Sequence, residues 1–177
     1  MKLVECVPNF SEGRDKAKVQ TIVDAAKSAG VTILDVEIDG DHHRCVLSFV
    51  GGPDACVEAC FRVARKSAEL IDLNHHKGEH PRMGAVDVIP FIPVAGVTIE
   101  DCAVLAEKLG ERIGRELHIP VYLYDCAAKR PERKDLANVR KGQFEGLRDI
   151  IGKDETRTPD FGPNRIHPTA GATAVGA

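Results

Sequence analysis

The predicted architecture depends most on residues 31–50, which read VTILDVEIDGDHHRCVLSFV. The first part, Val31–Ile38, is rich in β-branched side chains and is typical of a strand. Residues 39–41 (DGD) are typical of a turn, and Arg44–Val50 follows as a second strand. The segment therefore predicts a β-hairpin.

A helix is predicted on each side of this hairpin. Before it, apolar residues recur at i, i+3, i+4 and i+7, the spacing of one helix face: Val19, Ile22, Val23 and Ala26. Gly30 ends that helix. After the hairpin, Pro53 stands at a favoured first helical position, and the second helix is expected to run to about Ile71.

Two more strands complete a recognisable order. Leu3–Val7 precedes the first helix, and Ala85–Val94 follows the second. Pro90 and Pro93 lack an N–H, so the later strand should lie at a sheet edge or carry a bulge. The order strand, helix, strand, strand, helix, strand is the split βαβ pattern, which predicts an α+β, ferredoxin-like sandwich.

The remainder predicts an additional helix, strand and helix. Thr98 with Asp101 three positions later is a variant of the capping box that opens a helix. Pro120–Tyr124 is expected to be a strand, and residues 134–151 a helix. We expect residues 1–152 to form the domain and residues 153–177 to form a Gly/Pro-rich tail or linker.

One face of the predicted sheet should be covered by helices, which leaves the other face in need of a partner. A second domain or a second copy of the chain would bury it, and we expect a homodimer.

Composition narrows the classes of protein and partner. Hydrophobic residues make up 43% of the chain and the net charge is −3, which favours a folded domain and argues against a nucleic-acid binder. No apolar run approaches the roughly 20 residues of a membrane helix, and residues 1–10 do not resemble a signal peptide. We expect a cytoplasmic protein with six reduced cysteines and no membrane contact.

The densest chemical cluster is residues 75–82, HHKGEHPR. Histidine suits proton transfer near neutral pH, and a loop is a common place for catalytic groups. A solvated polar loop is the plain alternative. Residues 76–80 also fit the zinc-peptidase pattern H-x-x-E-H, but that motif needs a helix, and Gly78 and Pro81 oppose one. A metal-dependent hydrolase is therefore only a remote alternative.

Two further segments are open to more than one interpretation. Acidic residues alternate along the hairpin and share one strand face: Asp35, Glu37 and Asp39, with Asp41, His42, His43 and Arg44 beside them. They suit either metal or phosphoesterase chemistry or a polar outer surface. Residues 159–176 are dense in Gly and Pro and form either a defined loop or a linker.

Four stretches together resemble the formiminotransferase family. They are residues 4–13 (VECVPNFSEG), 76–85 (HKGEHPRMGA), 90–94 (PFIPV) and 160–163 (DFGP). The resemblance implies two related ferredoxin-like subdomains, of which this chain is the amino-terminal one. It implies transfer of a formimino group from N-formiminoglutamate to N5 of tetrahydrofolate in histidine degradation, with tetrahydrofolate as co-substrate and no metal.

The resemblance also assigns roles to residues. The family's catalytic histidine falls on His80. Its folate-contacting loop falls on residues 162–171, with these expected contacts: Gly162, Pro163, Asn164, His167 and Gly171. Both substrates carry carboxylates, so three cations near His80 are expected anchors: Arg44, Lys77 and Arg82. Glu79 is expected to orient an imidazole or a cation.

Two features separate this chain from the family pattern. His43 stands where the family usually has Asn, which bears on substrate preference. The second feature is length, because we expect this chain to hold only the amino-terminal subdomain. The family's substrates lie between its two subdomains, so we expect little turnover by this chain without the second one. The alternatives are a stand-alone folate- or glutamate-binding subdomain and a transferase specific for formylglutamate.

Overall fold

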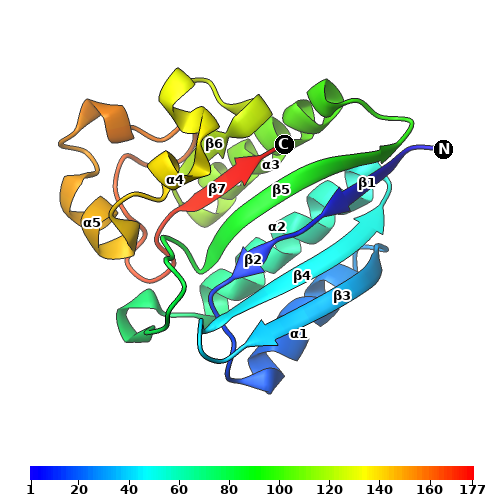
Figure 1. Ribbon diagram of the computed structural model, residues 1–177, viewed down its shortest axis with the longest axis horizontal. Coiled ribbons are helices and arrows are strands. Elements are labelled where there is room, and N and C mark those ends of the chain that lie inside the picture. The colour runs from blue at the N-terminus through cyan, green and yellow to red at the C-terminus, as the bar shows by residue number, and fades with distance from the viewer.

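The computed structural model describes residues 1–177 and contains one mixed sheet of seven strands with five α-helices (Figure 1). The strands follow one another across the sheet as β3 (Thr32–Asp39), β4 (Arg44–Gly51), β1 (Leu3–Cys6) with β2 (Asn9–Phe10), β5 (Val86–Ala95), β7 (Thr173–Gly176) and β6 (Val121–Tyr124). The strands from β3 to β5 pair antiparallel, whereas β7 is parallel to both β5 and β6.

The predicted order of elements through β5 is confirmed. Helix α1 (Lys16–Lys27) connects β2 to β3, and α2 (Pro53–Leu70) follows β4. The hairpin is antiparallel, with Thr32 opposite Val50 and Asp39 opposite Arg44. Local caps fix the helix starts: the Asp15 side chain accepts two N–H groups of α1, and Pro53 is the first residue of α2.

Strand β5 lies between β1/β2 and β7, but β7 pairs only with Val88, Ile89 and Pro90. The edge position is therefore wrong for Pro90, whereas Pro93 lies where β5 has a neighbouring strand on one side only. The other interpretation, a bulge, is right: opposite β1 the pairing shifts from Leu3–Ala95 to Val4–Pro93, which leaves one residue of β5 unpaired. Pro93 is tolerated because the ladder is already interrupted there.

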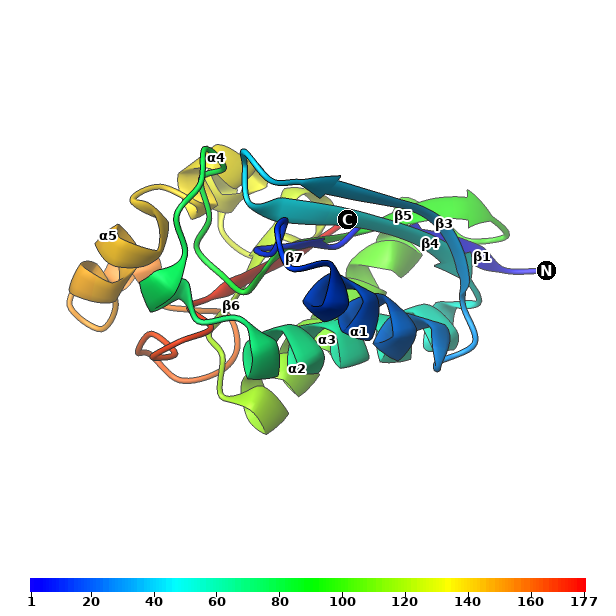
Figure 2. The same cartoon turned by 90° about the horizontal axis from the view of Figure 1, so that it is seen from below.

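The sheet has one fully covered face. Helices α1, α2 and α3 (Ile99–Leu117) lie together beneath it (Figure 2) and bury the main core. The Thr98–Asp101 capping box at the start of α3 is present as predicted. None of the helices is both long enough and apolar enough to cross a membrane.

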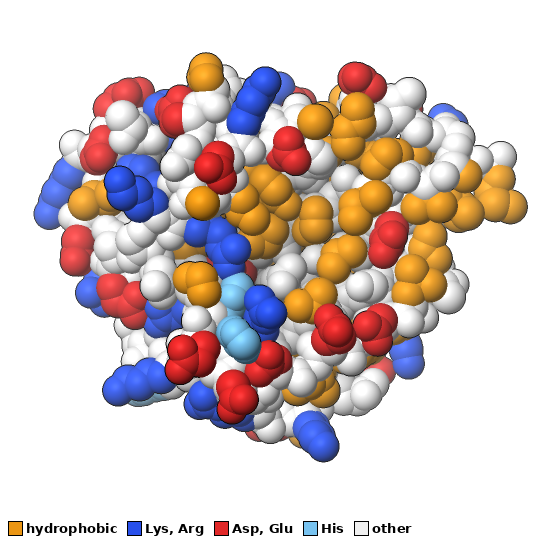
Figure 3. All heavy atoms as spheres, viewed as in Figure 1, with side chains coloured by type: hydrophobic (Ala, Val, Ile, Leu, Met, Phe, Trp, Pro, Cys, Tyr) orange, Lys and Arg blue, Asp and Glu red, His pale blue; other side chains and the backbone are white.

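The second face is covered over only part of its width. Helices α4 (Leu136–Val139) and α5 (Gln143–Ile150) cover the side of β5, β7 and β6, where they pack on a small core that includes Tyr122 and Leu147. The predicted open face is therefore wrong for this part. On β4, Val46 and Val50 alternate with residues buried under the helices, so they face the open side. Figure 3 shows a broad apolar area there.

Two elements differ from the sequence-based expectations. The helix expected over 134–151 is two short helices, separated where Gly142 and Gln143 have φ of 86° and 58°. The segment 153–177, expected as a tail or linker, ends in β7, which inserts between β5 and β6. Its sequence, TAVG, is too short and too small to predict a strand, and its pairing partners are far away in the chain.

Candidate active site

His80 lies in the loop that leads from α2 to β5, against the tip of the β3–β4 hairpin. The backbone N–H of Glu79 donates to the Asp41 carbonyl at 3.1 Å, and that of His80 donates to the His42 carbonyl at 3.4 Å. A Cβ on Gly78 would overlap the His42 carbonyl oxygen, so only glycine allows this approach. The loop is thus held by the hairpin, and His80 is only 5% exposed.

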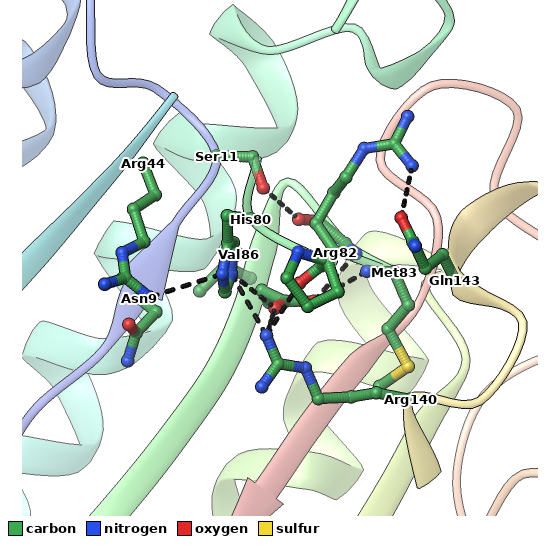
Figure 4. A network of polar contacts seen from close by, with 12 residues as sticks. Asn9, Ser11, Arg44, His80, Arg82, Met83, Val86, Arg140 and Gln143 are labelled. Atoms are coloured by element: carbon green, nitrogen blue, oxygen red, sulfur yellow. Dashed lines mark hydrogen bonds and ion pairs between the residues drawn. The ribbon is translucent and has the colours of Figure 1, made fainter. Parts of the chain in front are cut away.

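Three charged side chains surround the His80 ring. Its Nε2 lies 3.2 Å from Asp87 Oδ2, and its Nδ1 lies 3.3 Å from Nη1 of Arg44. Arg140 Nη2 is 3.1 Å from Nε2 and donates to Asp87 Oδ2 at 3.0 Å and to the Pro81 carbonyl at 2.7 Å. Figure 4 shows Arg44 and Arg140 approaching His80 from opposite sides. The site therefore combines β4, the loop, β5 and the α4–α5 connection.

Asp87 is the fixed point of this arrangement. It is completely buried in β5, and its Oδ1 accepts the backbone N–H groups of Met83 and Gly84 at 2.8 and 3.1 Å. A buried carboxylate needs such donors, and here two backbone groups and one guanidinium supply them. These contacts hold the Asp87 carboxylate in a fixed orientation beside His80.

Sequence analysis did not identify Asp87 or Arg140. Asp87 interrupts the otherwise apolar run AVDVIPFIPV, and an acid inside a buried strand is a signal that could have found it. Arg140 gives no local signal, because it is 60 positions from His80 and reaches the site only through the packing of α4 and α5.

The expected anchors lie in different surroundings. Arg44 is half-buried beside His80, and Lys77 and Glu79 are exposed on the loop. Arg82 is only 6% exposed and binds both carboxylate oxygens of Glu145 at 2.8 Å. Hydrogen bonds from Arg82 lower the pKa of Glu145 to about 2. Arg82 therefore ties the loop to α5 in this structure.

A stacked pair of histidines packs against the loop that carries His80. The rings of His43 and His76 are stacked, with centroids 4.3 Å apart. His76 Nδ1 accepts from Arg82 Nε at 3.0 Å, and its Nε2 lies 2.8 Å from the His43 carbonyl, to which it donates. His43 Nδ1 accepts the Gly13 N–H at 3.0 Å. Burial lowers the pKa of His76 and lowers that of His43 to about 4, so both rings are neutral near neutral pH.

The zinc-peptidase pattern does not form its motif here. Residues 76–80 are not helical, and both ring nitrogens of His76 bond to groups of the chain itself. No group of three or more His, Cys, Asp or Glu side chains is arranged to hold a metal. In the acidic hairpin cluster, Asp39 accepts the N–H groups of Asp41 and His42, and these bonds lower the pKa of Asp39.

The expected folate loop, residues 162–171, touches the His80 loop through its second half. Gly171 pairs with Gly84, and its φ of 69° and the nearby Met83 carbonyl leave no room for a side chain. His167 Nδ1 accepts the N–H groups of Thr169 and Ala170. The first half lies elsewhere: Gly162 packs against α3, Pro163 is half-buried and Asn164 is exposed.

Three hollows lie near these elements. One of about 210 Å³ is lined by His43 and His76 with Ser11, Glu12, Lys18, Leu70, Ile71, Asp72 and His75. A second, of about 400 Å³, is lined by Arg44 with Glu37, Ile38, Asp39, Gly40 and Val46. It therefore adjoins His80 through Arg44. The largest cavity, about 600 Å³, is lined by residues of β6, α4, α5 and the turns beside them, and His80 does not line it.

Comparison with known proteins places this chain in a family. The family model described as the formiminotransferase domain, N-terminal subdomain, matches residues 3–177. The chain is 50% identical over 177 residues to a glutamate formimidoyltransferase of Streptococcus pyogenes serotype M1 and 52% identical over 180 residues to one of Thermoplasma acidophilum. It is 46% identical over 177 residues to the formimidoyltransferase-cyclodeaminase of Mus musculus.

These matches cover 99–100% of this chain, but only 59%, 59% and 32% of the three relatives. The chain thus spans little more than half the length of the two formimidoyltransferases and about a third of the bifunctional protein. It belongs to the formiminotransferase family, as that family's N-terminal subdomain.

Proposed function

We propose that this chain supplies the catalytic histidine, His80, of a glutamate formimidoyltransferase. The complete enzyme transfers the formimino group of N-formiminoglutamate to N5 of tetrahydrofolate, its co-substrate, in histidine degradation. Two relatives that are 50% and 52% identical carry the name glutamate formimidoyltransferase. The observation that carries the proposal is one imidazole, held between a buried carboxylate and a guanidinium beside the open part of the sheet.

The chemistry fits a neutral imidazole. The N5 amine attacks the formimino carbon, a tetrahedral centre forms, and the amine loses a proton. His80 accepts this proton and returns one to the departing glutamate nitrogen. General acid–base help of this kind is worth roughly 10²–10⁴-fold.

Substrate anchoring is proposed for the cations near His80. Arg44 is the best placed, because it touches the ring and lines the 400 Å³ hollow. Lys77 and Glu79 are exposed and free to turn toward a ligand. Arg82 would reach a substrate only by leaving Glu145. Folate contact by residues 162–171 stays a prediction. Among the expected contacts, Asn164 is exposed and can both donate and accept hydrogen bonds.

The arrangement of the sheet bears on two proposals, a ferredoxin-like fold and a partner for the open face. The sheet order β3-β4-β1-β5, with α1 and α2 on one face, supports a ferredoxin-like unit. We propose that the second subdomain of the complete protein covers the open part of the other face, where Ile92 and Val94 are 39% and 51% exposed. A second copy of the chain is the alternative occupant.

The assay that tests the function compares two proteins and two donors. The complete protein should convert N-formiminoglutamate with tetrahydrofolate, and the 177-residue chain alone should show little turnover. Faster use of N-formylglutamate would assign the enzyme to that donor instead. No transfer from either donor by the complete protein, with tetrahydrofolate still bound, would leave a binding module.

A further inference from the structure

We propose that Asp87 and Arg140 are positioning residues that fix the tautomer of His80, so that Nδ1 is the nitrogen that exchanges a proton with the substrate. The inference rests on the proposed function of His80 and specifies how the chain prepares that side chain. It follows from the donors and acceptors around the ring.

The Nε2 edge of His80 faces an acceptor. The Asp87 carboxylate offers only acceptor atoms. Its Oδ1 is taken by the Met83 and Gly84 N–H groups, so Oδ2 is the atom that faces His80 at 3.2 Å. A neutral His80 makes this contact only when Nε2 carries the hydrogen.

The Nδ1 edge faces a donor. Arg44 Nη1 lies 3.3 Å away, and a guanidinium has no acceptor atom. Nδ1 must therefore present its lone pair. The other tautomer would place N–H against N–H at Nδ1 and a lone pair against a carboxylate at Nε2, so both edges select the same form.

Arg140 completes the arrangement without competing for the ring. Although its Nη2 is 3.1 Å from His80 Nε2, its hydrogens have acceptors in Asp87 Oδ2 and the Pro81 carbonyl. Through Pro81 it fixes the backbone next to His80, and through Asp87 it balances a buried negative charge. The α4–α5 connection thereby holds both the ring and the loop.

This tautomer sets the route of the proton. The hydrogen leaves the N5 amine for Nδ1 and passes from Nδ1 to the departing glutamate nitrogen, while the Nε2 hydrogen stays on the Asp87 side throughout. Asp87 stabilises the imidazolium formed between the two transfers. Arg44 occupies Nδ1 in this structure. A substrate carboxylate would form the stronger, charge-assisted bond with Arg44 and free the nitrogen.

The tautomer is measurable without turnover. In nitrogen-15 NMR spectra of the histidine-labelled chain at a pH where His80 is neutral, its Nε2 should be protonated and its Nδ1 unprotonated. The opposite assignment in the unmodified chain, or an equal mixture, overturns the proposal. This reading needs no variant and does not depend on what the enzyme transfers.

A matched variant pair tests the cause. In Asp87→Asn the amide oxygen can still accept from Met83 and Gly84, while its NH₂ faces Nε2. The acceptor at Nε2 is then lost and only Arg44 still favours the Nε2–H form, so the fraction of His80 in the Nδ1–H form should rise. Asp101→Asn, which alters a carboxylate in the α3 cap, should leave the tautomer unchanged. An unchanged His80 tautomer in a folded Asp87→Asn chain contradicts the role given to Asp87.

Kinetics of the complete enzyme separate positioning from support of the fold. Asp87→Asn should lower kcat by roughly 10²-fold or more with KM within a few-fold, because the wrong nitrogen faces the substrate. Arg140→Lys, which keeps one cation for Pro81 and Asp87, should retain more activity than Arg140→Gln. Equal activity of the two Arg140 variants contradicts its role. Failure of the wild type to transfer a formimino group would sink the proposed function but leave the tautomer result intact.

Discussion

At the residue scale, the stacked pair of His43 and His76 makes the loop sensitive to acid. His43 holds a left-handed backbone conformation with φ of 56°, and its Nδ1 accepts the Gly13 N–H. His76 accepts from Arg82 in the same way. Each bond exists only while the accepting nitrogen is unprotonated, so protonation of either ring removes a contact that holds the His80 loop.

Stability should therefore fall as the pH drops through a defined window. Burial and the neighbouring His76 lower the pKa of His43 from 6.5 to about 4, so the unfolded chain binds a proton before the folded chain does. The contribution is complete above pH 6.5 and is lost as the pH falls from 6.5 toward 4. Urea unfolding at several pH values in this range should show the decline.

His43→Asn is the matched control for that decline. Asparagine tolerates a positive φ, offers an oxygen to the Gly13 N–H and does not titrate. Its unfolding free energy should fall less steeply between pH 6.5 and 4 than that of the wild type. Parallel curves for the two proteins would show that His43 is not the titrating group.

Gly78 is the second residue-scale test. A methyl group there overlaps the backbone of His42, so Gly78→Ala must push the loop away from the hairpin. We expect a loss of about 1–3 kcal/mol of unfolding free energy. Gly52→Ala, where nothing lies within 4 Å of the added carbon, should cost less, and equal losses would argue against the close approach.

At the scale of elements, α5 and the His80 loop hold each other. Arg82 binds Glu145, and the Phe144 N–H donates to the Arg82 carbonyl at 3.0 Å. Glu145→Gln should cost about 1–2 kcal/mol at pH 7, a discounted value because the Glu145 side chain is half exposed. The pKa of Glu145 is lowered to about 2, so the pair stabilises the fold above pH 4.5 and is lost below it.

Urea unfolding at pH 7 measures this cost, and Glu111→Gln supplies its control. Glu111 pairs with Arg115 on the exposed surface of α3 and should contribute less than about 0.5 kcal/mol. If both substitutions cost the same, Glu145 does not hold the loop.

The elements that sequence analysis predicted correctly carry their own signals. The hairpin is marked by its turn, α1 by its apolar spacing and α3 by its capping box. Each of these signals lies within the element that it predicts or directly beside it. Strand β7 and the break between α4 and α5 depend on contacts with distant segments, and they were not predicted. The site divides in the same way: the loop with His80 was recognisable, whereas Arg140 reaches it only in the folded chain.

At the scale of the whole molecule, the sheet face opposite α1, α2 and α3 has a covered part and an open part. Helices α4 and α5 cover β6 and β7, while the apolar area over β4, β1 and the end of β5 is open (Figure 3). His80 lies in the loop that enters β5. A partner that covered the open area would close one wall of the site, in keeping with a chain that spans only 59% of its closely similar relatives.

Ile92→Lys tests that surface. Ile92 is already 39% exposed, so the substitution should change the unfolding free energy of the 177-residue chain by no more than about 0.5 kcal/mol. In the complete protein it should loosen the packing of the second subdomain, seen as faster proteolysis between the two parts and a higher KM. Val104 is 50% exposed on α3, and Val104→Lys should neither speed proteolysis nor raise KM. Identical behaviour of the two variants would place the partner elsewhere.

The most direct test of the role of His80 is the single-turnover rate of formimino transfer by the complete enzyme with saturating N-formiminoglutamate and tetrahydrofolate. His80→Gln keeps a polar side chain of similar length but cannot accept the proton, so the rate should fall by roughly 10²-fold or more while both substrates still bind. A rate within a few-fold of the wild type would contradict the assignment of proton transfer to His80.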